Sequence, residues 1–134
     1  MADVKEIYSH LDSLFPRSLS CSWDNDGLMV CPDSSEKVKK VLLALDVTQK
    51  VANEAICGGY DVIISHHPLI FRPLRQLSEE FAGAAVPMKL FSAGISVISL
   101  HTRFDAGEGG INDTLASLLG FDVTAPFGEE GEMC

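Results

Sequence analysis

The stretch "KVKKVLLALDVTQKVANEAICGGYDVIIS", residues 37–65, decides the fold. It contains an apolar run within 38–47, a helical segment that Thr48 can cap and that ends at the glycine pair 58–59, and a second apolar run within 60–65. Near-continuous apolar strands that alternate with helices are typical of a parallel sheet covered on both faces. The stretch therefore predicts two neighbouring parallel strands joined by a helix.

The same alternation continues on both sides of this unit. An amphipathic helix is predicted over 3–15, with Asp3 and Glu6 as a capping box. Further along, the pattern predicts a helix or two over 78–93, interrupted or restarted at Pro87, then a strand over 95–100 and a last helix over 111–119. Residues 25–27 are expected to form a turn. The fold class is therefore α/β, with a mainly parallel sheet and helices on both faces.

Composition sets the class of protein. The chain has 134 residues, with 46% hydrophobic and 22% charged, so we expect a single α/β domain over 1–134 with a loose tail at 127–134. Its 19 acidic and 10 basic residues give a net charge of -9, which disfavours nucleic acid and anionic membranes as partners. The sequence has no signal-peptide pattern, no C-x-x-C pair and no apolar run of membrane-spanning length, which together favour a cytoplasmic protein.

Groups that can bind metal follow three successive predicted strands. The first strand ends at Asp46, the second at His66 and His67, and the third at His101, with Asp105 four residues later. Ligands of open parallel sheets bind beyond the carboxyl ends of the strands. If the strands are neighbours, these side chains lie along one rim of the sheet.

Two interpretations of these histidines stay open on spacing alone. Neighbouring strand residues point to opposite faces, so His66 and His67 can converge only if the backbone leaves strand geometry, which Pro68 favours. Asp105 can reach them from the same helical face as His101 or from a loop that wraps the site. Imidazole and carboxylate ligands together suit Zn, Mn, Fe, Co or Ni. Two adjacent histidines can each hold one ion of a pair. A single histidine at a strand end is otherwise ordinarily a partly buried residue bonded to backbone.

Other charged and aromatic residues give weaker signals. The "DNDG" segment at 24–27 lacks the spacing of a calcium loop and is interpreted as a turn. Three arginines near the predicted rim could contact phosphate, but solvent-facing charge is the preferred interpretation of each: Arg72, Arg75 and Arg103. No aromatic cluster for base stacking is evident.

Four motifs together resemble the NIF-three-like, YbgI-type dinuclear metal-binding family, often named GTP cyclohydrolase 1 type 2 homologues. They are "WDNDGL" at 23–28, "LALDVT" at 43–48, "SHHPLIF" at 65–71 and "SLHTRFDAGEGGINDTLA" at 99–116. The resemblance implies an α/β fold with two divalent metal ions at the rim and assembly into toroidal homohexamers. It also implies His66, His67 and Asp105 as metal ligands, with His101 in or beside the metal shell.

The resemblance leaves two functions open. Members of that family are normally longer and return to the site with a further histidine and a glutamate, which this sequence lacks. The resemblance therefore implies that residues 1–134 correspond to the N-terminal half of such a protein, with a partial site that binds metal more weakly. The first function is a metal-dependent hydrolase of an unidentified small molecule, with a metal-activated water and no catalytic side chain assigned. The second is a non-catalytic metal-binding regulatory or scaffold protein that acts through protein-protein assembly.

Overall fold

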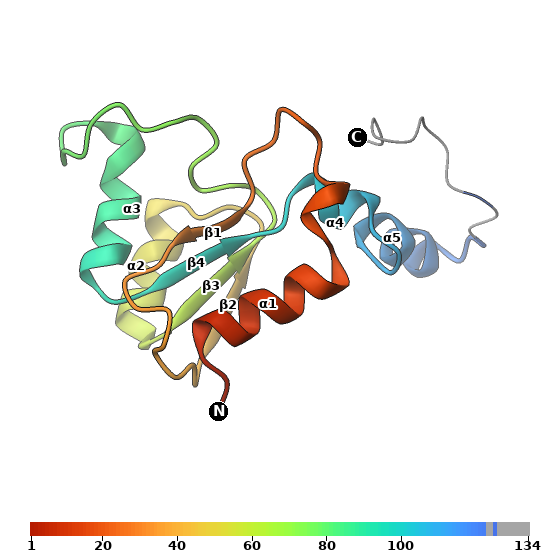
Figure 1. Ribbon diagram of the computed structural model, residues 1–134, viewed down its shortest axis with the longest axis horizontal. Coiled ribbons are helices and arrows are strands. Elements are labelled where there is room, and N and C mark those ends of the chain that lie inside the picture. Colours follow the sequence, from red (N-terminus) through yellow and green to blue (C-terminus); the bar gives the residue numbers. More distant parts are fainter. Residues whose placement is uncertain (123–124, 126–134) are drawn as a thin grey trace.

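A four-stranded sheet forms the centre of the fold in the computed structural model, which describes residues 1–122 and 125 (Figure 1). Its strand order is β1-β4-β3-β2. Strands β2 (Val41–Ala44), β3 (Val62–Ser65) and β4 (Ser96–Ser99) run parallel, and β1 (Gly27–Val30) pairs antiparallel with β4. The predicted mainly parallel sheet is therefore confirmed, with β2 at one edge and β1 at the other.

Helices cover both faces of this sheet, as predicted. Helices α2 (Gln49–Gly58) and α3 (Ala82–Ser92) pack on one face, and α1 (Val4–Leu14) packs on the other (Figure 1). Because side chains alternate along a strand, each central strand contributes residues to two buried layers, one on each face of the sheet. The first layer lies beneath α2 and α3, and the second lies beneath α1. The buried residues of the first layer are Val30, Val47, Ala52, Ala55, Ile63, Leu90, Ile95 and Val97. Those of the second are Val4, Val38, Val62, Ile98 and Leu100.

The helix ends follow from local sequence. Asp3 and Glu6 form the predicted capping box of α1, because each side chain accepts a hydrogen bond from the backbone N–H of the other. Thr48 caps α2 through the N–H of Val51, and Gly59 ends that helix in the left-handed region with φ 62°. Three shorter elements complete the described chain: the 3-10 helix η1 (Arg17–Leu19), α4 (Thr102–Ala106) and α5 (Ile111–Leu119).

Two local predictions were wrong. Gly27 was expected to close a turn but begins strand β1, with φ 110°, because this segment pairs with β4, a partner distant in sequence. Helix α3 was expected to break or restart at Pro87 but runs through it. Ala84, Pro87 and Leu90 are buried, so packing against the sheet outweighs the backbone bond that proline removes.

The strand register brings the predicted rim residues together. Ser65 pairs with both Ala44 and Ser99, so β2, β3 and β4 end level with one another. The hydroxyl groups of Ser65 and Ser99 lie 2.9 Å apart and join the ends of the two central strands. Residues that follow these three strands therefore leave the sheet along one rim, at the carboxyl ends of the strands.

The remaining predictions on chain organisation concern the tail and the membrane. The loose tail predicted at 127–134 lies outside the described residues. None of the helices within the described ranges combines the length and apolar character that crossing a bilayer requires.

Candidate metal centre

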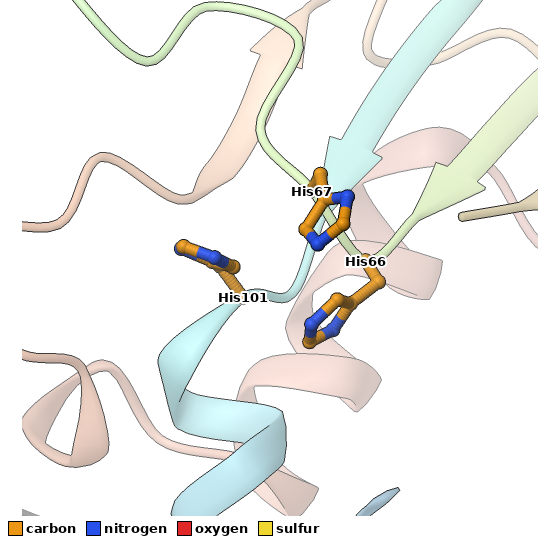
Figure 2. A group of neighbouring side chains, drawn as sticks. All are labelled: His66, His67 and His101. Atoms are coloured by element: carbon orange, nitrogen blue, oxygen red, sulfur yellow. The ribbon is translucent and has the colours of Figure 1, made fainter. Parts of the chain in front are cut away.

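Three histidines meet beyond the carboxyl ends of β3 and β4. His66 and His67 follow β3 directly, and His101 precedes the first turn of α4 (Figure 2). One ring nitrogen from each of them can be chosen so that all three lie within 4.8 Å of one another. This separation is close enough for the three imidazoles to share a bound ion or a pair of ions.

The backbone after β3 leaves strand geometry, as the sequence requires for two adjacent histidines to converge. The N–H groups of His66 and His67 still donate to Ala44 and Leu45 at the end of β2, at 3.2 and 2.9 Å. The Ser65 hydroxyl donates to the His67 carbonyl at 3.0 Å and closes the turn. The two imidazole rings then lie side by side, with centroids 4.8 Å apart.

Asp105 reaches the same cluster from α4. The sequence left open whether His101 and Asp105 share a helical face or a loop, and the structure places Asp105 within a short helix whose N-cap is His101. An Asp105 carboxylate oxygen lies 3.7 Å from His66 Nε2. All four residues predicted as ligands therefore lie together, with Asp105 on the His66 side.

Two of the three imidazoles have a carboxylate behind them. His67 Nδ1 lies 2.8 Å from Asp46 Oδ1, and His101 Nδ1 lies 2.9 Å from Asp24 Oδ1. An imidazole bonded to a carboxylate through Nδ1–H keeps Nε2 free as a lone-pair donor, an arrangement common behind metal-bound histidines. Together with Asp105, these carboxylates give the rim a negative field that favours cations.

His66 lacks such a partner. Its Nδ1 is the one buried side-chain nitrogen or oxygen atom of the described residues that has no hydrogen-bond partner. A buried polar atom without a partner is unfavourable, and its presence in a native site needs a cause. A bound cation is a partner that an imidazole nitrogen can take.

Asp24 is a residue of this site that the sequence interpretation missed. Its segment was interpreted only as a turn, and the signal that could have identified it is its place in the "WDNDGL" motif. Burial would by itself raise the pKa of Asp24, but hydrogen bonds from Thr102 and His101 outweigh it and lower that pKa. Asp24 is therefore a carboxylate, in contact with His101.

Arg103 corrects another prediction. It was expected to face solvent, yet its side chain is 0% exposed and binds Asp26 through two nitrogens at 3.0 and 2.8 Å. A third nitrogen contacts Asp12 at 2.7 Å. Burial opposes the charge, but hydrogen bonds with Asp26, Tyr8 and Asp12 raise the pKa of Arg103 above its usual value. This ion pair ties α4, which carries Asp105, to α1 and to the segment before β1.

An aromatic group lies beside the histidines, although the sequence showed none. Trp23 and Phe71 are both exposed, with ring centroids 6.1 Å apart, and lie 6.2 and 6.3 Å from the His101 ring. The Asn25 amide donates to the Ile70 carbonyl and joins the two loops that carry them. The two rings come from segments distant in sequence, so no local pattern indicated their contact.

The topology and this rim define an α/β protein in which histidines and carboxylates line the carboxyl ends of the parallel strands. Residues 2–133 match the family Duf34/NIF3 (NGG1p interacting factor 3), and the chain belongs to this family. The resemblance found in the sequence is thereby confirmed.

Two relatives similar in sequence have the same name. The chain is 41% identical over 117 residues to a GTP cyclohydrolase 1 type 2 homolog of Staphylococcus aureus (strain Mu50 / ATCC 700699), covering 87% of this chain and 31% of the relative. A protein of the same name from Clostridium perfringens (strain 13 / Type A) is 36% identical over 119 residues, covering 89% and 45%.

Solved structures have the same fold as this chain. A Bacillus cereus protein related to NIF3 matches with a TM-score of 0.83 and 38% identity over 95% of this chain and 35% of that one. Reduced HcgD from Methanocaldococcus jannaschii matches with a TM-score of 0.85 and 30% identity over 97% and 52%. The chain thus spans between 31% and 52% of the length of these four relatives.

Proposed function

We propose that His66, His67, His101 and Asp105 hold divalent transition-metal ions, and that the protein uses them to hydrolyse a small molecule. The observation that carries this proposal is the convergence of three imidazole nitrogens within 4.8 Å at the carboxyl edge of a parallel sheet. Two ions per complete site are proposed, as the family resemblance implies.

The donor set fits such an ion. Imidazole and carboxylate ligands together suit Zn, Fe, Mn, Co or Ni better than Ca or Mg. The unpartnered, buried His66 Nδ1 and the carboxylates behind His67 and His101 agree with this use. A bound divalent ion would supply Lewis acidity and lower the pKa of a coordinated water toward neutrality.

The surrounding residues suggest how a substrate is held. Trp23 and Phe71 offer exposed aromatic surface beside His101, on which a planar ring can stack. Arg72 and Arg75 follow Phe71 on the exposed loop and can pair with an anionic group. GTP, which appears in the names of the relatives, has both a planar ring and an anionic group.

A binding or scaffold role is the second candidate, and one observation favours it. Helix α5 exposes Leu115, Leu118 and Leu119, a surface typical of contact with another protein or another copy of the chain. A catalytic metal site needs an open, exchangeable position, whereas a structural site is closed by protein ligands. Exchange of bound Zn²⁺ for added Co²⁺ within minutes would favour the hydrolase.

The first prediction concerns metal content. We expect the purified chain, reconstituted with Zn²⁺ and measured by elemental analysis, to retain metal that His66→Ala/His67→Ala loses almost completely. His10→Ala is the matched control, because His10 is exposed on α1, away from the rim, and should retain the metal of the wild type. Circular dichroism would establish that the variants are folded, and light scattering would give their mass.

Two outcomes would contradict the proposal. Equal metal content in the wild type and the double variant would place any ion elsewhere. Metal bound at the rim without consumption of GTP or related nucleotides, followed by chromatography, would leave the site but remove the nucleotide hydrolase and favour the scaffold role.

A further inference from the structure

We propose that Asp24 is a positioning residue for the histidine cluster. Its carboxylate selects the Nδ1–H tautomer of His101 and fixes the ring, so that Nε2 is the nitrogen available to an ion. This inference deepens the proposed metal site and rests on it for its consequence, but the tautomer itself can be measured without metal.

The contacts of Asp24 account for its rigidity. Its side chain is 0% exposed, and each carboxylate oxygen is used. Oδ1 contacts His101 Nδ1 at 2.9 Å and accepts from the Asn25 N–H at 2.7 Å. Oδ2 accepts from the Thr102 hydroxyl at 2.6 Å and from the Thr102 N–H at 3.2 Å. A buried carboxylate held by several donors has one orientation, so the ring that it holds has one orientation too.

The hydrogen-bond network continues away from the site. The Thr102 hydroxyl that donates to Asp24 also accepts from the backbone N–H of Cys21 at 3.0 Å. One network therefore fixes the His101 ring and the first turn of α4, the helix that carries Asp105. Asp24 thus sets the orientation of the His101 ring and anchors the helix that carries Asp105.

The second carboxylate behind a histidine offers a natural comparison. Asp46 lies 2.8 Å from His67 Nδ1, almost the same distance, but its side chain is 55% exposed. Exposed charged pairs are screened by solvent and restrain their partners weakly. His101 is therefore held before an ion binds, whereas His67 keeps freedom to rotate, and removing the Asp24 charge should weaken binding more than removing that of Asp46.

The substitution that tests this is Asp24→Leu. Leucine is similar to aspartate in shape but offers His101 Nδ1 no acceptor. The proton of the neutral imidazole is then free to move to Nε2, which blocks the ligating nitrogen. Thr102→Val is the matched control, because it removes the hydroxyl that bonds to Asp24 and to the Cys21 N–H without changing what faces His101.

Two readouts on the full chain separate positioning from simple structural support. The tautomer of His101 is measured by nitrogen-15 NMR on the metal-free protein at alkaline pH, where imidazoles are neutral. Zn²⁺ affinity is measured by equilibrium dialysis. We expect Nδ1–H in the wild type, Nε2–H in Asp24→Leu, and a loss of Zn²⁺ affinity of about 10- to 100-fold in that variant. Asp46→Leu and Thr102→Val should both stay within about threefold of the wild type on the same scale.

The outcomes distinguish this inference from the proposed function. Nε2–H in wild-type His101, or an unchanged tautomer in folded Asp24→Leu, would overturn the positioning role whatever the metal does. Equal losses of affinity in Asp24→Leu and Thr102→Val, at unchanged tautomer, would make Asp24 a structural residue only. A wild type with Nδ1–H and no Zn²⁺ binding would overturn the metal site and, with it, the consequence for affinity. If Asp24→Leu does not fold, the wild-type tautomer still decides the first point.

Discussion

Replacing Arg103 with methionine is expected to lower the free energy of unfolding by about 3–5 kcal/mol, the usual effect of removing one partner of a buried ion pair. Arg103 and Asp26 both have fully buried side chains and form a two-pronged contact. Methionine fills much of the space but leaves the Asp26 carboxylate in the interior with weaker partners. Urea unfolding followed by circular dichroism measures the change.

Arg17→Met is the matched control for that experiment. Arg17 also forms an ion pair with Asp26, at 3.4 Å, but its side chain is 56% exposed. Its loss should cost about 1 kcal/mol or less. Equal effects of the two substitutions would mean that burial of the Arg103 pair does not govern the stability of this region.

Truncation of Ile98 is the second substitution expected to have a large effect. Ile98 lies on the central strand β4, is completely buried and belongs to the layer beneath α1. Ile98→Ala should lower the free energy of unfolding by about 2–5 kcal/mol, because it removes buried methyl groups and leaves a cavity. Ile98→Val should cost about 0.5–1.5 kcal/mol in the same urea titration.

Leu43→Ala provides the control at the edge of the same sheet. Leu43 lies on β2 and is 74% exposed, so its truncation should change stability by less than about 0.5 kcal/mol. A loss comparable to that of Ile98→Ala would indicate that another copy of the chain covers the β2 edge in solution. The protein concentration dependence of the unfolding midpoint would then reveal that association.

The parts of the fold that were predictable depend on neighbours in sequence. The capping box of Asp3 and Glu6, the Thr48 cap and the left-handed Gly59 are all set within a few residues, and all were predicted. The rim was predictable for another reason. Parallel strands must end at one edge, so side chains that follow β3 and β4 meet there whatever the details of the loops.

The parts that were missed depend on partners distant in sequence. Strand β1 is set by its antiparallel pairing with β4, and no periodicity within four residues could indicate it. Arg103 resembles any surface arginine until Asp26, 77 positions away, is brought against it. Asp24 and His101 are also separated by 77 positions. Sequence therefore predicted the proposed ligands but not the residue that orients one of them.

The same spacing has a consequence for synthesis of the protein. Asp24 leaves the ribosome long before His101, and the two must wait for β4 to pair with β1 before they meet. A nascent chain that has reached residue 100 carries His66 and His67 but neither His101 nor Asp105. Any ion that requires all four residues is consequently acquired only after translation has passed Asp105.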